Sequence, residues 1–131
     1  MKKAVLIPDS FKGTMSSGEI CAVMKARIDR HFPGCEVVSI PVADGGEGSV
    51  DAFLTALGGE KVCLEVGNPY FEPMQGFYGL IDSGRTAVVE MAACAGLPLV
   101  EGRRDPAKTT TYGVGELILD AAGRGGRWAL A

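Results

Sequence analysis

Short apolar segments alternate with amphipathic helical patterns along the first half of the chain, and this alternation restricts the folds that the chain can adopt. Residues 4–7 are continuously apolar, as expected for a strand buried on both faces of a parallel sheet. A capping-box sequence at 16–19 then opens a predicted helix. A second strand is predicted at 36–40 and a second helix at 50–57. The order strand–helix–strand–helix predicts a βαβ unit and a doubly wound α/β sheet.

The pattern changes in the second half of the chain. Residues 61–66 alternate between apolar and polar side chains, which suits a strand at a sheet edge or in a half-exposed sheet. A turn-rich stretch follows, and two further strands are predicted at 77–81 and 86–91. We interpret these strands as an antiparallel insertion or a small second lobe. A last helix is predicted at 113–122, and a further strand is expected to start within residues 127–131.

Length, charge and cysteine spacing argue against several kinds of partner. A chain of 131 residues is long enough for one domain with a real core, and its net charge of −3 gives no electrostatic case for binding nucleic acid or an anionic membrane. No apolar segment is long enough to span a bilayer, so we expect a cytoplasmic protein. Zinc and redox motifs need two thiols within a few residues, and no two cysteines lie that close. We expect reduced thiols in or near the core at Cys21, Cys35, Cys63 and Cys94.

Two polar loops lie where open α/β sheets bind their ligands, beyond the carboxyl ends of the strands. The loop at 8–14 and the loop at 41–48 each leave an apolar strand and enter a helix. Both contain an aspartate, and both contain glycine that allows a ligand to approach the backbone closely. The candidate site residues are Asp9, Ser10 and Lys12 in the first loop, and Asp44, Gly45, Gly46, Glu47 and Gly48 in the second.

These residue types suit phosphoryl transfer. That reaction needs a cation to offset phosphate charge, a carboxylate for Mg²⁺ or for a hydroxyl proton, and amides at a helix N-terminus. Lys12 supplies the cation, and the glycines supply the amides. The carboxylate comes from Asp9, Asp44 or Glu47. No Walker sequence is present, and a structural alternative stays open in which Asp44 caps the second helix and Lys12 is a solvated surface residue.

Three later features carry weaker signals. Glu90 ends a predicted strand, where it either faces the ligand site or has a structural role. The polar stretch at 109–115 enters the last helix and is able to hold an anion, although we favour threonine capping plus a turn. His31, the single histidine, has no evident partner in the sequence, and we expect it at the surface.

Four motifs resemble those of bacterial-type glycerate kinases, a family unrelated to the Walker and protein-kinase folds. They are PDSFKG at 8–13, PVADGGEGSVDA at 41–52, EMAACAGL at 90–97 and TTYGVGELI at 110–118. Their order and spacing make the resemblance specific, and it covers nearly the whole chain. The resemblance implies phosphorylation of a hydroxyl of D-glycerate, with Mg²⁺ and with ATP as the phosphate donor.

The same resemblance implies roles for individual residues. Asp9, Lys12 and Asp44 are the candidate catalytic residues, with Asp44 near the Mg²⁺–phosphate group and Lys12 near an anionic group. Which carboxylate binds the metal and which accepts the hydroxyl proton stays open. The candidate metal ligands are Asp44 and Glu47. The candidate substrate- or phosphate-binding residues are Ser10, Gly45, Gly46, Gly48, Thr110 and Gly113.

The family implies a two-lobed α/β architecture with the active site between the lobes. We therefore expect a Rossmann-like three-layer parallel sheet and the start of a smaller second α/β lobe. The predicted parts are a βαβαβ half at 1–66, a strand-rich segment of the second lobe at 67–104, and a helix with the start of a further strand at 105–131.

The chain departs from the family in two respects. NPYFEPM at 68–74 stands in for a more glycine-rich turn, and the segment Gly-Gly-Ser-Ala-Thr-Asn-Asp-Gly-Gly, found further along in family members, is absent. We expect a truncated chain, an N-terminal piece that is inactive by itself. Three alternatives stay open: a non-catalytic module for a phosphorylated or carboxylated metabolite, a structural fragment with ordinary turns, and a kinase of another hydroxy acid.

Overall fold

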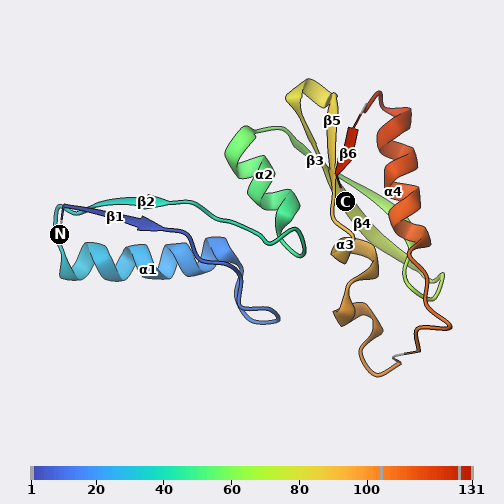
Figure 1. The fold of residues 1–131 in the computed structure, drawn as a ribbon, viewed down its shortest axis with the longest axis horizontal. Coiled ribbons are helices and arrows are strands. Elements are labelled where there is room, and N and C mark those ends of the chain that lie inside the picture. Colours follow the sequence, from blue (N-terminus) through green and yellow to red (C-terminus); the bar gives the residue numbers. More distant parts are fainter. Residues whose placement is uncertain (1, 104, 127, 131) are drawn as a thin grey trace. The chain divides into compact units, whose positions relative to one another are not determined.

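The computed structural model describes residues 2–103, 105–126 and 128–130 (Figure 1). The chain forms two compact units, Met1–Asp44 and Gly45–Ala131. Both contain helices and strands, so the predicted α/β class is confirmed. Within the described ranges, no helix combines the length and the apolar character needed to cross a membrane.

The first unit is a single βαβ motif. Strand β1 (Lys3–Leu6) and strand β2 (Glu36–Ser39) pair in parallel, and helix α1 (Ser17–His31) connects them. The predicted capping box is present, because the Ser16 hydroxyl accepts from the Glu19 amide and the Glu19 carboxylate accepts from the Ser16 amide. This cap fixes where α1 begins, directly after the loop that follows β1.

The core of the first unit is small. Leu6, Ile20 and Cys21 are buried between the strands and α1. Val5, by contrast, is 51% exposed and Val23 is 52% exposed. The prediction that the first strand is buried on both faces is therefore wrong for this structure. A sheet of two strands with one helix has only one covered face, and the other face of each element stays in solvent.

The second unit is built on a mixed four-stranded sheet. Its strands are β3 (Glu60–Gly67), β4 (Pro73–Ile81), β5 (Thr86–Val89) and β6 (Trp128–Leu130), in the order β3-β4-β5-β6. Strands β3 and β5 each pair with β4 in antiparallel orientation, and β6 is parallel to β5. Helix α2 (Ser49–Leu57) precedes this sheet in the chain.

Helices cover both faces of the sheet in the second unit (Figure 1). Helix α4 (Tyr112–Gly123) packs against one face together with the short helix α3 (Ala92–Ala95), and this cluster contains the larger part of the core. On the other face, Val50 of α2 packs against Ile81 and Val88. The sheet is therefore the middle layer of three. The remaining elements are two short 3-10 helices, η1 (Asp82–Gly84) and η2 (Leu97–Val100).

The third strand joins a different sheet from the one that we predicted. Its register with β4 runs from Glu60 opposite Leu80 to Gly67 opposite Pro73, so β3 belongs to the antiparallel sheet and not to the sheet of β1 and β2. The chain accordingly divides after Asp44 instead of after residue 66. The physical reason lies in the alternation of β3, because Val62 and Val66 bury one face of the strand in the α4 cluster.

A buried tyrosine anchors α4 to the sheet. The Tyr78 ring is fully buried, and its hydroxyl donates to Asp120 Oδ2 at 2.6 Å. Arg124 Nε donates to the same oxygen at 2.8 Å. Burial, then the hydrogen bond to Asp120, raises the pKa of Tyr78 to about 12. The hydrogen bonds from Tyr78 and Arg124 lower the pKa of the Asp120 carboxyl.

These two shifts predict how stability depends on pH. The pKa of Tyr78 is raised from 10.0, so its contribution is present below pH 10 and is lost as the pH rises towards about 12. The pKa of Asp120 is lowered from 3.8, so its contribution is present above that pH and is lost as the pH falls below it. Urea unfolding of Tyr78→Phe should show a stability lower by about 1 kcal/mol at pH 7. It should also show a weaker loss of stability above pH 10.

The matched control is Tyr112→Phe, because the Tyr112 side chain is exposed. This variant should follow the parent chain at every pH. An unchanged alkaline profile in Tyr78→Phe would contradict the assignment of the loss to this hydroxyl.

Candidate functional site

The loop after β1 presents Lys12 at its tip. The amide of Phe11 donates to the carbonyl of Met15 at 2.9 Å, and the Met15 amide donates back to the Phe11 carbonyl at 3.1 Å. The turn closes through Gly13, which has a φ of 78° that other residues rarely adopt. The turn therefore holds Lys12 between two hydrogen-bonded ends, with its side chain in solvent.

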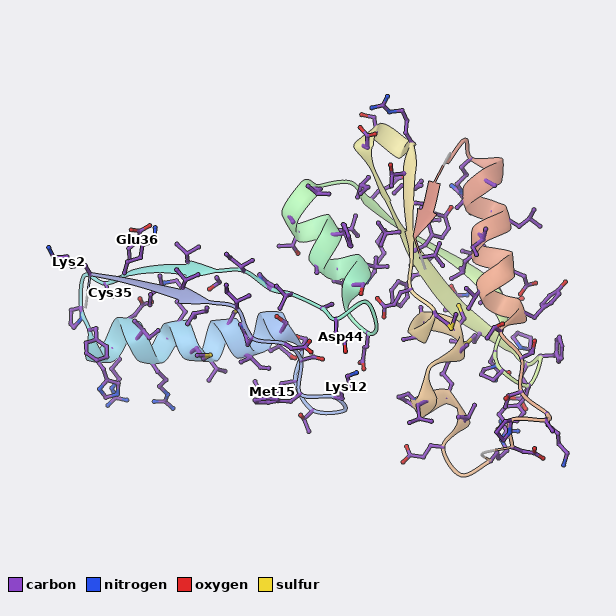
Figure 2. The ribbon with its side chains drawn as sticks, in the orientation of Figure 1. Lys2, Lys12, Met15, Cys35, Glu36 and Asp44 are labelled. Atoms are coloured by element: carbon purple, nitrogen blue, oxygen red, sulfur yellow. The ribbon has the colours of Figure 1, made fainter. Side chains whose placement is uncertain are left out.

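Lys12 lies beside Asp44, as the two-loop prediction requires. Lys12 Nζ is 3.3 Å from Asp44 Oδ2, and Figure 2 shows the two side chains directed towards one another. Asp44 comes soon after β2, so the contact follows from two parallel strands that end at the same edge of their sheet. Both side chains are more than half exposed, and such a pair contributes at most about 1 kcal/mol. A phosphate or a metal ion can therefore replace either partner at little cost.

One buried hydroxyl joins the two loops. Ser17, at the start of α1, donates to the carbonyl of Pro8 at 2.6 Å. It accepts from the amide of Val42 at 3.1 Å. Since Pro8 precedes Lys12 and Val42 precedes Asp44, Ser17 fixes the distance between the bases of the two loops. Ser17 is not among the residues predicted for the site, although its position beside the capping serine Ser16 is a sequence signal for such a role.

Asp9 and Ser10 lie in the first loop and are joined by a local hydrogen bond. Asp9 Oδ1 accepts from the Ser10 amide at 2.7 Å, and the Asp9 side chain is exposed. The hydrogen bond of Asp9 is thus made within its own loop. Of the three predicted catalytic residues, the structure shows Lys12 and Asp44 in contact.

The glycine-rich segment before α2 begins the second unit. Gly45 and Gly48 have φ values of 95° and 90°, so both positions need glycine. The hydroxyl of Ser49 donates to the carbonyl of Gly46 at 2.8 Å, which closes the turn into the helix. The Glu47 side chain is exposed. The segment therefore presents a carboxylate on a tight backbone turn.

Glu90 satisfies the amides at the start of α2. The N-cap residue of this helix is Gly48, which has no side chain to cap it. Glu90, at the end of β5, accepts from the Gly48 amide at 3.1 Å and from the Val50 amide at 3.2 Å, and it is 3% exposed. Of the two roles left open for Glu90, the structure shows the structural one. The Gly48 amide is one of the backbone amides that we expected to face a phosphate. In the structure it donates to the Glu90 carboxylate.

Thr110 and Gly113 have structural contacts of their own. The Thr110 amide donates to the carbonyl of Pro69 at 2.9 Å, and its hydroxyl accepts from the Tyr112 amide at 3.1 Å in a local turn. The N-cap residue of α4 is Thr111, which forms no side-chain cap hydrogen bond, so the turn that we favoured is present and the threonine cap is not. A Cβ atom on Gly113 would lie 2.0 Å from the carbonyl oxygen of Gly67. Gly113 is therefore required for the close approach of α4 to the end of β3.

The donor set fits a metal ion that is held together with a phosphate. Mg²⁺ in such sites takes one or two carboxylates from the protein and keeps phosphate oxygens and waters as its other ligands. Asp44 and Glu47 offer two carboxylates within one short segment. No group of three or more His, Cys, Asp or Glu side chains suited to a metal occurs in the part of the chain that the structure describes.

The fold and the loops define an α/β protein whose charged groups follow the carboxyl ends of parallel strands, the usual position for small anionic ligands. A sequence model described as the glycerate kinase family matches residues 4–129. The chain belongs to the glycerate kinase family. The earlier resemblance is thereby confirmed.

Individual relatives agree with this assignment. The chain is 44% identical to a glycerate kinase of Bacillus subtilis (strain 168) over 117 residues, which are 88% of this chain and 31% of that protein. It is 42% identical to a glycerate 2-kinase of Escherichia coli (strain K12) over 120 residues, 91% of this chain and 32% of that protein. A crystal structure from Salmonella typhimurium LT2, described as glycerate kinase 2, matches with a TM-score of 0.76 and 39% identity, over 98% of this chain and 34% of that one. The chain thus spans about a third of the length of these relatives.

The position of Ser17 leads to a first prediction for the site. Ser17→Ala removes the donor to Pro8 and leaves the Val42 amide unpaired, so the first unit should lose about 1–3 kcal/mol of stability. Amide hydrogen exchange should become faster at Val42. Ser39→Ala, at the exposed end of β2, is the control and should change neither quantity. Unchanged exchange at Val42 would mean that Ser17 does not hold the second loop.

Glu90 leads to a second prediction. Glu90→Gln replaces one acceptor oxygen with a donor, so one of the Gly48 and Val50 amides loses its partner. The second unit should lose about 1.5–3 kcal/mol, because these hydrogen bonds have a charged acceptor. Hydrogen exchange should accelerate at Gly48 and Val50. Glu101→Gln, on an exposed turn, should leave both amides protected, and equal exchange in the two variants would refute the capping role.

Proposed function

We propose that a protein containing this chain is a glycerate kinase, which transfers the γ-phosphate of ATP to a hydroxyl of D-glycerate. Membership of the glycerate kinase family and the names of the relatives support this activity. The single observation that carries it is the contact between Lys12 Nζ and Asp44 Oδ2, which joins a cation and a carboxylate at the ends of two parallel strands. Phosphoryl transfer depends on those two groups.

Lys12 and Asp44 have distinct roles in this proposal. The Lys12 ammonium, exposed at the tip of its turn, binds a phosphate oxygen or the substrate carboxylate and offsets its charge. Asp44, together with Glu47 of the following segment, would hold Mg²⁺. A magnesium ion held there would supply positive charge against the negative charge that develops on the phosphate. Asp9 is the remaining carboxylate of the set and the candidate acceptor of the hydroxyl proton.

The polar groups of the other loops complete the proposed substrate contacts. Ser10 contributes a hydroxyl beside Asp9, and Gly45 and Gly46 allow a phosphate to approach the backbone. Thr110 keeps a hydroxyl hydrogen to donate, since its oxygen already accepts from Tyr112. The remaining predicted binding residues are Gly48 and Gly113. Gly48 allows the backbone turn before α2, and Gly113 allows α4 to pack closely against the end of β3.

The acceptor hydroxyl and the location of the protein are finer parts of the proposal. The name of the Escherichia coli relative, glycerate 2-kinase, supports the hydroxyl at carbon 2. Analysis of the product distinguishes 2-phosphoglycerate from 3-phosphoglycerate. We place the protein in the cytoplasm, where ATP is available.

Ligand binding to this chain tests the proposal. Mg·ATP with D-glycerate should raise the unfolding temperature, since a ligand at 100 times its Kd stabilises the folded state by about 2.7 kcal/mol. Asp44→Asn and Lys12→Ala should each reduce this shift by more than half, because they remove a contact to the metal or the phosphate. The matched controls are Asp29→Asn and Lys25→Ala, which break an exposed ion pair on α1.

The outcomes separate the components of the proposal. If all four variants kept the full ligand-induced shift in unfolding temperature, Lys12 and Asp44 would not belong to the binding site. Turnover in a chain of the family's full length that persists in Asp44→Asn would refute the metal-binding role. Binding without any turnover in that longer chain would favour a non-catalytic module over a kinase.

A further inference from the structure

A pocket of about 270 Å³ lies where the end of β3 meets the first turn of α4. Two aromatic rings and two carboxylates line it, from Phe71, Tyr112, Glu65 and Glu116. All of these residues belong to the second unit, and none is among the residues of the proposed phosphoryl-transfer site.

Close backbone packing forms the pocket. The α4 helix can lie against Gly67 only because Gly113 has no side chain, since a Cβ there would meet the Gly67 carbonyl oxygen at 2.0 Å. The Glu116 carboxylate accepts from the Gly67 amide at 2.8 Å, so a side chain of α4 also holds the helix against the end of β3. Tyr112 and Glu116, one turn apart on α4, are thereby placed beside the end of β3.

Both rings are unusually exposed for aromatic side chains. Phe71 is 67% exposed and Tyr112 is 58% exposed, and their centroids are 5.7 Å apart at an interplanar angle of 47°. Phe71 also has a φ of 62°, a conformation that is uncommon for a residue with a bulky side chain. An Asx turn stabilises this conformation, because Asn68 Oδ1 accepts from the amides of Tyr70 and Glu72.

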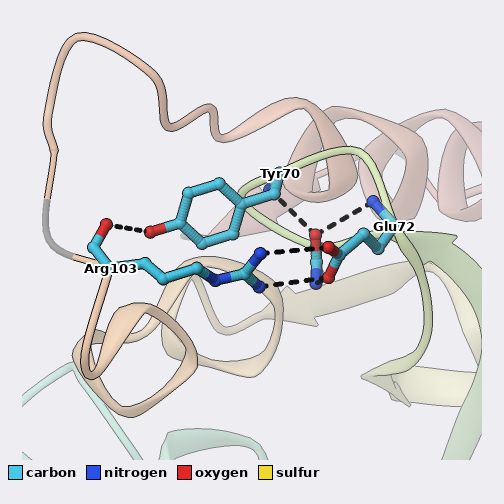
Figure 3. A network of polar contacts seen from close by, with 4 residues as sticks. Tyr70, Glu72 and Arg103 are labelled. Carbon is cyan, nitrogen blue, oxygen red and sulfur yellow. Dashed lines mark hydrogen bonds and ion pairs between the residues drawn. The ribbon is translucent and has the colours of Figure 1, made fainter.

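A polar network keeps the loop that carries Phe71 rigid. Arg103 forms two hydrogen bonds with the Glu72 carboxylate, at 3.1 and 3.2 Å, and its guanidinium lies 4.1 Å from the centroid of the Tyr70 ring (Figure 3). The Tyr70 hydroxyl donates to the Arg103 carbonyl oxygen. Tyr70 and Glu72 thus bind a guanidinium by stacking on a ring and by pairing with a carboxylate.

The pocket also combines aromatic rings with carboxylates, and its Phe71 lies between Tyr70 and Glu72 in the chain. Phe71 and Tyr112 provide ring faces, and Glu65 and Glu116 provide carboxylates. Among the residues that the structure describes, no Lys, Arg or His lines it. A cation over an aromatic ring binds more strongly when the site also holds negative charge. A planar guanidinium suits such a site best, because it stacks on rings and pairs with carboxylates.

We propose that the pocket between Phe71, Tyr112, Glu65 and Glu116 binds a guanidinium group, supplied by a small guanidine or by an arginine of a protein partner. The volume suits a group of this size. The loop is held by its own hydrogen bonds, so binding needs no reorganisation of its backbone. The proposal is independent of ATP and glycerate.

The test is an NMR titration of the 131-residue chain with N-butylguanidinium and with its neutral analogue N-butylurea. The cation should shift the resonances of Phe71 and Tyr112 saturably, and it should bind at least about threefold more tightly than the urea. The affinity should fall when the salt concentration rises. A third arm, the peptide acetyl-Gly-Arg-Gly-amide, identifies the source. Tighter binding of the peptide indicates a protein arginine, and equal binding indicates a small guanidine.

Variants with matched controls locate the site. Phe71→Leu and Glu65→Gln should each weaken the binding of the cation about threefold or more. Phe53→Leu, an exposed aromatic on α2, and Glu60→Gln, on the same strand as Glu65, should leave the affinity unchanged. Equal affinity for the cation and the urea, or equal affinity in all four variants, would overturn the proposal. The Glu65→Gln variant keeps the test decisive if Phe71→Leu alters the loop.

Discussion

Backbone amides at the ends of strands and the starts of helices need hydrogen-bond partners, and in this chain side chains remote in sequence supply them. Ser17 binds the Val42 amide, Glu90 binds the amides of Gly48 and Val50, and Glu116 binds the Gly67 amide. Each contact joins one loop to a different element. The positions of the charged groups in the proposed site and of the aromatic pocket follow from these three side chains.

The charged groups of the protein divide into two kinds by their exposure. Lys12 and Asp44 are exposed, so their attraction is weak and exchangeable, which suits groups that meet a ligand. Glu90 is buried with both oxygens engaged, so it is suited to holding the backbone and not to exchanging partners. The carboxylates that look alike in the sequence therefore differ in function because of their surroundings.

Local sequence patterns predicted the helices and strands well, and they predicted that the two loops after β1 and β2 lie together. Apolar periodicity, the capping box and glycine stops are local signals, and the contact of Lys12 with Asp44 follows from parallel pairing. The sheet to which β3 belongs depends on which elements cover Val62 and Val66, which no local pattern encodes. The backbone amides that Ser17 and Glu90 bind lie 25 to 42 residues away along the chain, so only the tertiary structure identifies them.

The two glycines in the first turn of α4 differ in whether they can be replaced by a larger residue. A Cβ on Gly113 would collide with the carbonyl of Gly67, whereas a Cβ on Gly115 would meet nothing within 4 Å. Glycine inside a helix costs about 1 kcal/mol relative to alanine. Gly115 is accordingly a position at which the helix can be strengthened without disturbing its packing, and Gly113 is a position that any redesign of the second unit has to keep.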